Sequence, residues 1–302
     1  MTSDRNTLLV IAGPTGSGKT DLAVELAVRL CAPILSADSR QVFRDMPVGT
    51  AQPSPQQLAT VKHYFIADRE VSEEFNAGIF EREALELLER LFAENEYVVM
   101  VGGSGLYIDA VCYGLDALPT ADPNLRDELA ERLEREGLEV LAGELEQLDP
   151  VGYAAIDRNN PARVIRALEV CRQTGRPYSE QRIGEHKQRS FRIVKVAIET
   201  PREELYGRIN QRVDGMIAAG LVSEAQKMYP YRHLNALQTV GYKELFEYFD
   251  GTITLDRAVE LIKRNSRRYA KRQMTWLRRD ADIHWVTRHD ADLVENLCKK
   301  NL

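Results

Sequence analysis

The sequence lacks the features of a membrane or secreted protein. No apolar stretch approaches the roughly 18 residues that a membrane-spanning helix needs. The first apolar run, Leu8–Ala12, follows polar residues and ends at a glycine, which is not the pattern of a secretory leader. We therefore expect a soluble, cytoplasmic protein with no membrane partner.

Cysteine is scarce and scattered, and no two cysteines form a Cys-x-x-Cys pair. The 4 cysteines are Cys31, Cys112, Cys171 and Cys298. Their spacing excludes a disulfide framework and a structural zinc site, so we expect free thiols packed as small apolar side chains. Internal repeats and low-complexity stretches are also missing, which excludes a repeat architecture.

The net charge of −6 does not by itself indicate a nucleic-acid partner. The distribution of charge is more informative. Arg158–Arg192 holds nine Lys or Arg residues and three acids, and Lys263–Arg279 holds eight and no acid. Segregated basic blocks in an acidic protein indicate contact with a phosphate backbone, although either block alone also fits a solvated helix face.

Strands and helices alternate in the first third of the chain. Apolar runs predict strands at Leu8–Ala12, Pro33–Ala37 and Tyr97–Val101, and helical spacing predicts helices at Asp21–Leu30, Ala77–Ala93 and Leu106–Val111. This alternation is typical of βαβ units in a parallel sheet, so the fold class is α/β.

The pattern changes after Leu115. Residues 123–180 predict helices and turns without a strand, and Phe191–Glu199 then returns as a strand. Helices at 202–219, 241–249 and 255–278 and a strand at Ile283–Val286 follow. We therefore predict a core domain of residues 1–117 and 191–302 with a helical insertion at 118–190.

A phosphate-binding loop lies between the first strand and the first helix. Gly13–Thr20 fits the pattern G-x-x-x-x-G-K-[ST] in the required strand–loop–helix context. The glycines allow the backbone to approach phosphate oxygens, and the helix N-terminus adds partial positive charge. Lys19 would bridge phosphates and the Thr20 hydroxyl would ligate Mg²⁺. The loop predicts that a diphosphate or triphosphate binds, without identifying the reaction.

Asp38 follows the second predicted strand. The carboxyl ends of parallel strands face the ligand crevice, so Asp38 would point toward the bound phosphates. A carboxylate there accepts a proton from a nucleophile or holds Mg²⁺ through water, or it only shapes the turn. The other strand, Tyr97–Val101, ends in Gly-Gly-Ser-Gly rather than the Asp typical of an NTPase, which weakens the interpretation as a motor or GTPase.

Four stretches together resemble the bacterial form of the tRNA dimethylallyltransferase (tRNA isopentenyltransferase) family. They are Gly13–Thr20, Asp38–Phe43 continuing to Pro53, Val101–Tyr107 and Ala270–Arg278. Weaker similarities lie at Asn160–Glu169 and Val240–Glu244, so the resemblance runs over residues 8–279. The Cys/His zinc extension of eukaryotic relatives is missing. Members of this family transfer a dimethylallyl group from its diphosphate to the exocyclic amine of the adenine at position 37 of tRNA, 3′ of the anticodon, giving i6A.

The resemblance implies a P-loop NTPase-like core with an inserted all-helical tRNA-binding domain. It also implies that the loop holds the diphosphate of the prenyl donor rather than a nucleotide. The implied diphosphate-binding residues are Gly13, Pro14, Thr15, Gly16, Ser17, Gly18, Lys19 and Thr20, with Mg²⁺ on Thr20.

Three residues carry implied catalytic roles. Asp38 would take the amine proton, Ser104 would hydrogen-bond near the bridging oxygen, and Arg212 would neutralise charge growing on the leaving diphosphate. The implied tRNA contacts are Asp38, Ser39, Arg40, Gln41, Arg126, Ala162, Arg163, Val164, Ile165 and Arg166. The family resemblance also implies a monomer with no obligate protein partner.

The basic block near the C-terminus adds a hypothesis about tRNA. Arg264, Arg268, Lys271 and Arg278 would share an exposed helix face that follows phosphates, while Ile262, Tyr269 and Trp276 pack on the other.

Three residues depart from the family pattern. Ser104 replaces Thr, Phe43 replaces a common Tyr, and Gln52 replaces a common Lys, which removes one cationic contact. We expect His63, in a matching segment, to be structural.

Three alternatives remain open from the sequence. A small-molecule kinase would use the same loop with ATP, a related transferase would prenylate free adenine nucleotides, and a diverged paralogue would bind tRNA without catalysis.

Overall fold

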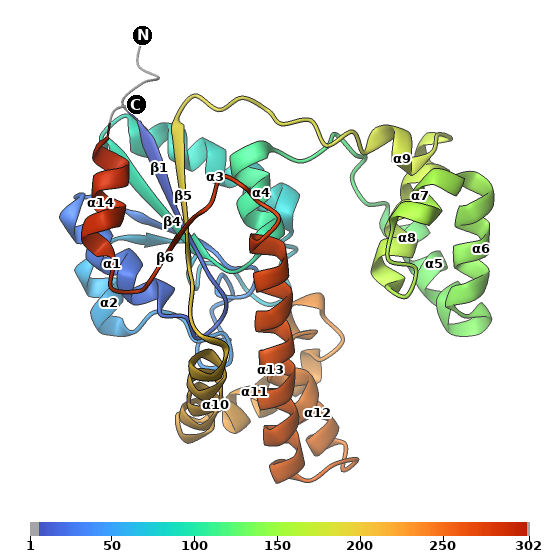
Figure 1. Cartoon of the computed structure of the whole chain (residues 1–302). Helices are drawn as coiled ribbons and strands as arrows, with labels where there is room; N and C mark the ends of the chain where they lie inside the picture. Colours follow the sequence, from blue (N-terminus) through green and yellow to red (C-terminus); the bar gives the residue numbers. More distant parts are fainter. Residues whose placement is uncertain (1–5, 301–302) are drawn as a thin grey trace. The chain divides into compact units, whose positions relative to one another are not determined.

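Six parallel strands form the sheet of the larger unit (Figure 1). The computed structural model describes residues 6–300, and the strands lie in the order β3-β2-β4-β1-β5-β6. They are β1 (Thr7–Ala12), β2 (Ile34–Ala37), β3 (His63–Tyr64), β4 (Tyr97–Gly102), β5 (Arg192–Ile198) and β6 (His284–Val286). Every pair of neighbouring strands is parallel, so each connection between strands must cross over the sheet.

The chain divides into two compact units, residues 1–112 with 188–302 and residues 113–187. The helices that begin in the larger unit are α1 (Lys19–Arg29), α2 (Pro55–Thr60), α3 (Ala77–Phe92), α4 (Gly105–Tyr113), α10 (Arg202–Ala218), α11 (Leu221–Met228), α12 (Tyr242–Phe249), α13 (Leu255–Leu277) and α14 (Ala291–Lys299), with 3-10 turns η1 (Tyr229–Tyr231) and η2 (Asn235–Leu237). The smaller unit holds α5 (Pro123–Glu136), α6 (Leu138–Leu148), α7 (Pro150–Ala155), α8 (Pro161–Thr174) and α9 (Tyr178–Gln181).

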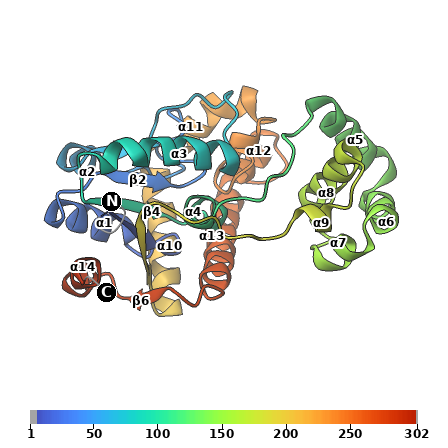
Figure 2. The ribbon, with the colours of Figure 1, turned by 90° about the horizontal axis from the view of Figure 1, so that it is seen from above.

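Apolar side chains on both faces of the sheet explain why the central strands β1 and β4 are almost entirely apolar. α1 and α14 cover one face, where Leu22 and Leu26 pack with Leu9, Val99 and Val194 in one buried cluster. α3 and α4 lie on the opposite face (Figure 2), and the rings of Phe80 and Tyr107 there are 5.1 Å apart. A parallel sheet that is covered on both faces requires strands without polar alternation.

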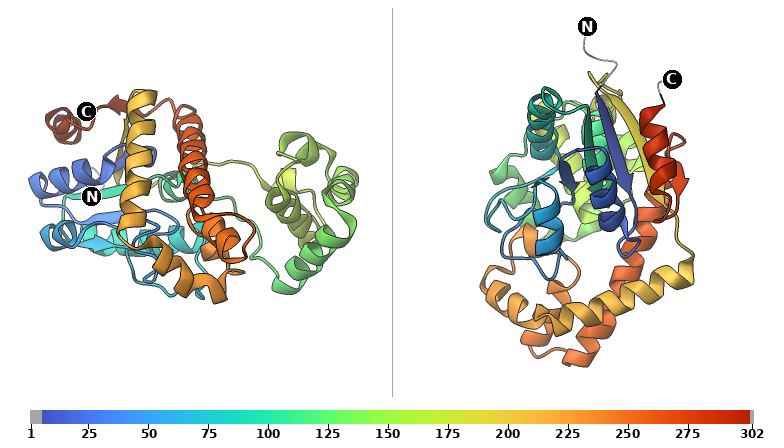
Figure 3. Two further views of the ribbon diagram at one scale, coloured as in Figure 1. Left: turned by 90° about the horizontal axis from the view of Figure 1, so that it is seen from below. Right: turned by 90° about the vertical axis from the view of Figure 1, so that its left-hand side faces the viewer.

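The carboxyl ends of the three central strands lie at one level. Ala12 of β1 and Ala37 of β2 both pair with Gly102 of β4. The loops that leave these strands therefore meet at one edge of the sheet. α10 and α13 pack together near this edge (Figure 3), through Leu205, Ile209 and Ala270 among others.

The smaller unit has a core of its own. Leu129 of α5, Leu145 of α6 and Leu168 of α8 are fully buried in one cluster. The side chains of Asp122, Asp149 and Asn160 cap α5, α7 and α8, and each helix has a proline in its first turn. The unit begins and ends a few residues earlier than the 118–190 expected from the sequence, because Tyr113 and Lys187 pair through their backbones.

The sequence predicted the main strands and helices to within about two residues but did not predict α2, β3, α11 or α14. Across residues 6–300, no helix combines the length and apolar character needed to cross a membrane. The four cysteines are free thiols, with Cys31 exposed and the other three buried.

The close approach of β2 and β4 predicts the effect of one substitution. A Cβ at Gly102 would lie 2.1 Å from the Ala37 carbonyl oxygen, so the Gly102→Ala variant must separate two central strands. We expect the free energy of unfolding to fall by about 1–3 kcal/mol. Urea denaturation followed by tryptophan fluorescence measures it, since both tryptophans, Trp276 and Trp285, lie in the larger unit.

Gly207→Ala is the matched control, because Gly207 is an exposed position of α10 where an added Cβ would meet no atom within 4 Å. That change is expected to be neutral or to stabilise by up to about 1 kcal/mol. Equal destabilisation by both substitutions would contradict the close strand contact.

Candidate active site

The loop Gly13–Gly18 connects β1 to the start of α1, and its backbone adopts a conformation that its glycines permit. Gly16 and Gly18 adopt φ values of 81° and 89°, in the left-handed region that other residues rarely enter. Gly18 is the N-cap of α1, so the first free N–H groups of the helix lie beside the loop. The segment from Gly13 to Thr20 therefore runs from the end of β1 through a glycine-rich loop into the first turn of α1.

Two cations and one carboxylate lie close together beside this loop. Burial, with the nearby Arg212 guanidinium, lowers the pKa of Lys19 to about 8, while Asp38 acts in the opposite direction. Burial also lowers the pKa of Arg212, again opposed by Asp38. The Lys19 Nζ lies 3.4 Å from the Pro14 carbonyl oxygen, to which it donates. The site therefore holds more positive than negative charge, which fits an anionic ligand.

Asp38 is fixed by the turn that follows β2. Its Oδ1 accepts hydrogen bonds from the N–H groups of Arg40 at 2.9 Å and Gln41 at 3.3 Å. Both hydrogen bonds are accepted by the same carboxylate oxygen. Asp38 lines the same small cavity as Lys19 and Thr20.

Ser104 connects the turn that follows β4 to the turn that follows β2. Its N–H donates to the Ala37 carbonyl at 3.3 Å, and its Oγ accepts from the Ser39 N–H at 3.1 Å. Tyr269 of α13 faces both Ser104 and Asp38, and burial raises the pKa of its phenol. The hydroxyl at position 104 therefore lies within the site, as expected for a residue that replaces Thr.

The loop after Asp38 is held by side-chain amides. Gln41 donates from Nε2 to the Ala51 carbonyl at 3.0 Å and accepts from the Ser36 hydroxyl at 3.1 Å. Gln52 donates to the carbonyls of Gln41 at 2.9 Å and Phe43 at 2.8 Å. Gln52 thus has a structural contact where a lysine is common in the family, and Phe43 is buried at 1% exposure.

A small cavity of about 10 Å³ lies among Lys19, Thr20, Asp38 and His63. A volume of this size holds about one water or one ion. Burial lowers the pKa of His63, its Nδ1 lies 2.8 Å from the Val61 carbonyl, and its Nε2 has no hydrogen-bond partner among the described residues. His63, expected to be structural, therefore borders the candidate site.

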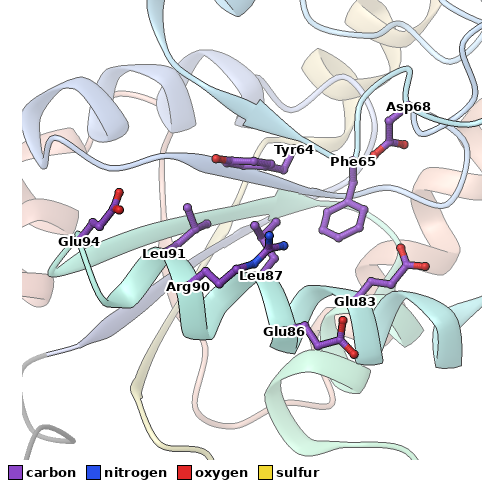
Figure 4. Close-up of a pocket in the computed structure, with 9 residues that line it drawn as sticks. All are labelled: Tyr64, Phe65, Asp68, Glu83, Glu86, Leu87, Arg90, Leu91 and Glu94. Carbon is purple, nitrogen blue, oxygen red and sulfur yellow. The ribbon is translucent and has the colours of Figure 1, made fainter.

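A larger cavity of about 480 Å³ lies elsewhere, between β3 and α3 (Figure 4). Its lining includes Tyr64 and Leu91 together with the acids Asp68, Glu83, Glu86 and Glu94 and a single arginine, Arg90. Its excess of carboxylates makes it a poor site for an anionic ligand.

The residues expected to contact tRNA in the smaller unit differ in exposure. Ala162 and Arg163 are exposed in the first turn of α8, and Ile165 is half-buried. Val164 has 0% exposure and packs in the core of the unit, so its side chain does not reach the surface.

Arg126 and Arg166 converge on one buried carboxylate. Each lies 2.8 Å from Oε2 of Glu169, whose side chain has 0% exposure. Arg166 also donates to the Pro119 carbonyl at 2.6 Å. The pairing of both arginines with Glu169 was not predicted from the sequence, although Glu169 is an acid on the apolar side of a basic helix.

Both basic blocks hold cations that pair within the protein. In the first, Arg172 pairs with Glu128 and Glu144, and Arg189 pairs with Glu81. In the second, Lys263 pairs with Asp214, whereas the four cations of the expected face are exposed: Arg264, Arg268 and Lys271 of α13 and Arg278 at its C-cap.

The opposite side of α13 packs inward. Ile262 is buried, Tyr269 and Trp276 are half-buried, and Trp276 Nε1 donates to Asp109 at 3.0 Å. Arg40 lies near Asn235, and burial lowers its pKa.

The match to a family model covers most of the chain. Residues 41–280 match the model described as IPP transferase. The chain is 52% identical over 289 residues to a tRNA dimethylallyltransferase 2 of Parabacteroides distasonis, covering 96% of this chain and 97% of the relative. It is 49% identical to a tRNA dimethylallyltransferase of Cytophaga hutchinsonii, covering 95% and 94% of the two chains.

Solved structures are similar over the same length. A tRNA isopentenylpyrophosphate transferase from Bacillus halodurans aligns with a TM-score of 0.71 and 37% identity, covering 97% of this chain and 95% of that one. A eukaryotic dimethylallyltransferase acting on tRNA aligns with a TM-score of 0.76 and 25% identity, covering 95% and 75%. The fold is therefore a P-loop NTPase-like parallel sheet with an inserted helical unit, and the chain belongs to the IPP transferase family.

Proposed function

We propose that this chain transfers the dimethylallyl group of dimethylallyl diphosphate to the exocyclic amine of the adenine 3′ of the anticodon in tRNA. The activity follows from membership of the family, whose members at about half identity are tRNA dimethylallyltransferases over nearly the whole chain. The observation that carries the chemical proposal is the proximity of Lys19, Arg212 and Asp38 at the phosphate loop.

The donor binds through its diphosphate. The loop from Gly13 to Thr20 supplies backbone N–H groups, and Lys19 and Arg212 supply two positive charges beside it. As the bond between the allylic carbon and the diphosphate oxygen breaks, its electron pair leaves with the diphosphate. The two cations stabilise that growing charge, and the Ser104 hydroxyl is a further donor to it.

The acceptor amine attacks the same allylic carbon and forms the new carbon–nitrogen bond. One amine proton passes to the Asp38 carboxylate, which the N–H groups of Arg40 and Gln41 hold in place. A neutral adenine amine is a weak nucleophile, so alignment of the two substrates supplies much of the rate. The adenine must leave its stack to reach a site this enclosed.

The residues present fit Mg²⁺. The Thr20 hydroxyl, the Asp38 carboxylate and a cavity large enough for one ion or water lie together, and oxygen donors of this kind suit Mg²⁺. Among the described residues, no group of three or more His, Cys, Asp or Glu side chains could hold a metal ion, which agrees with an ion held mainly by phosphate and water. When bound, Mg²⁺ adds charge stabilisation to the leaving diphosphate.

The tRNA contacts come from both units in this proposal. Ser39, Arg40 and Gln41 border Asp38, and the exposed face of α13 with its C-cap, Arg278, carries four cations. In the smaller unit, Ala162 and Arg163 are exposed and Arg126 and Arg166 are oriented by Glu169. Phosphate neutralisation by such residues makes tRNA affinity dependent on salt. The protein acts as a monomer, and no protein partner is required.

The test is transfer of labelled dimethylallyl diphosphate, with Mg²⁺, to unmodified tRNA, alongside AMP and a reaction without acceptor. Label in tRNA alone is the expected result. Label in AMP would assign the activity to free nucleotides instead. Phosphoryl transfer from ATP to a metabolite, without prenyl transfer, would replace the proposal with a kinase.

The charge state of Lys19 predicts a pH dependence. The protonated amine binds diphosphate, and its pKa in the free protein is lowered to about 8. As pH rises above this value, free protein loses the proton that binding requires, so kcat/KM for the donor should fall by up to about tenfold per pH unit. Steady-state rates at saturating tRNA measure this. Lys19→Arg, which keeps its charge, should lack this alkaline fall, and a flat wild-type profile to about pH 10 would contradict the role of Lys19.

Asp38→Asn tests the proton acceptor. The amide keeps an oxygen for the N–H groups of Arg40 and Gln41, so the turn is retained while the base is lost. We expect kcat to fall by about 10²–10⁴-fold with tRNA affinity nearly unchanged. Asp45→Asn, an exposed acid in the same loop, is the control and should leave kcat unaltered. Equal rates for Asp38→Asn and wild type would remove Asp38 as the base.

Arg163→Gln and Arg172→Gln separate a phosphate contact from a structural arginine on one helix. Arg163 is exposed, whereas Arg172 pairs with Glu128 and Glu144. Loss of Arg163 should reduce the slope of log Kd against log salt for tRNA by about 0.7–0.9, as for one phosphate contact. Arg172→Gln should leave the slope unchanged. Fluorescence anisotropy with labelled tRNA measures both, and the reverse pattern would exchange the two assignments.

A further inference from the structure

Gln273 lies on the buried side of α13 and bridges two loops of the candidate site. Its Oε1 accepts a hydrogen bond from the Thr15 N–H at 2.9 Å, and its Nε2 donates to the Gly103 carbonyl at 2.8 Å. The residue is 7% exposed, and its neighbours on the same side of the helix, Ala270 and Leu277, are apolar. A polar side chain therefore occupies a core position of this helix.

The surroundings hold this amide in one orientation. A buried amide is costly unless its donor and acceptor are both satisfied, and here each is matched by a backbone group. A Cβ at Gly103 would lie 2.2 Å from Nε2, so only glycine leaves the amide room to reach the carbonyl. Because the amide is planar and short, two hydrogen bonds to it fix the separation of the two loops.

The two bridged loops carry different parts of the chemistry. Thr15 belongs to the phosphate loop, and Gly103 precedes Ser104. Ser104 in turn accepts from the Ser39 N–H, beside Asp38. A continuous set of hydrogen bonds therefore links the diphosphate site to the turn that holds the proton acceptor.

We propose that Gln273 is a positioning residue for prenyl transfer. It locks the phosphate loop to the Gly103–Ser104 turn, so that the leaving diphosphate and the Asp38 carboxylate stay aligned. The proposal rests on the proposed function. Its physical basis is that displacement of reacting groups by about 1 Å lowers rates by about 100-fold, even when the changed residue does not touch the substrate.

The experiment removes the bridge from each side. Gln273→Met keeps the length of the side chain and abolishes both hydrogen bonds, whereas Gly103→Ala displaces the amide from the opposite loop. The two single variants, the double variant and Gly207→Ala are assayed in the full chain with dimethylallyl diphosphate and tRNA. Gly207 is exposed on α10, where an added Cβ would meet no atom within 4 Å, and it is not among the proposed tRNA contacts.

The expected result is a fall in kcat of about 100-fold for each single variant, normalised to the folded fraction from urea denaturation. The KM for tRNA should stay within about twofold, because Gln273 is buried and bonds to Thr15 and Gly103 rather than to a proposed tRNA contact. The double variant should be no slower than the single variants, since both remove the same bridge. Gly207→Ala should match wild type.

Three results would overturn the proposal while wild-type transfer remains intact. They are unchanged normalised kcat in Gln273→Met, multiplicative losses in the double variant, or a loss confined to the KM for tRNA. Absence of prenyl transfer by the wild-type chain would instead overturn the proposed function, so the two failures are distinguishable.

Discussion

The site is built around two cations that are buried beside a single carboxylate. Burial disfavours the charged forms of Lys19 and Arg212, and the Asp38 carboxylate favours the charged form of both. One carboxylate does not balance two cations, so the folded chain retains an excess of positive charge there. In the proposed function, a diphosphate supplies the missing negative charge. The loop glycines, the turn after β2 and the helices α10 and α13 all serve to bring these groups together.

The parallel sheet makes this arrangement available because its central strands end at one level. Gly102 pairs with both Ala12 and Ala37, so the phosphate loop, the Asp38 turn and the Ser104 turn begin side by side. The residues farther along each loop are then held by side chains from distant parts of the chain. Glu224 of α11, for example, accepts from the N–H groups of Val48 and Gly49 at 2.8 and 2.7 Å, which secures the loop after Asp38.

The parts of the structure that could be predicted are those with a strong local signal. β1, β2, β4 and β5 are rich in apolar residues, and Gly13–Thr20 has a fixed spacing, so each was evident from the sequence. β3 has only two residues, His63–Tyr64, and such a short segment gives no periodicity to detect.

Long-range pairing was not predictable in the same way. Gln273 and Thr15 are 258 positions apart, and no sequence pattern links them. Charge counts were also insufficient, since Arg172 and Arg189 in a basic block form internal ion pairs while Arg163 is exposed. The signal that would have helped is a polar residue at a core position, as for Gln273 and Glu169, because such a residue requires a partner.

Equilibrium binding of a non-hydrolysable dimethylallyl diphosphate analogue, in competition with ATP, tests the central claim most directly. The account predicts that the analogue binds wild-type protein with Mg²⁺, that Lys19→Met abolishes this binding, and that ATP does not displace the analogue at equal concentration. Displacement by ATP, or unchanged binding to Lys19→Met, would contradict the claim that the loop holds the diphosphate of the prenyl donor.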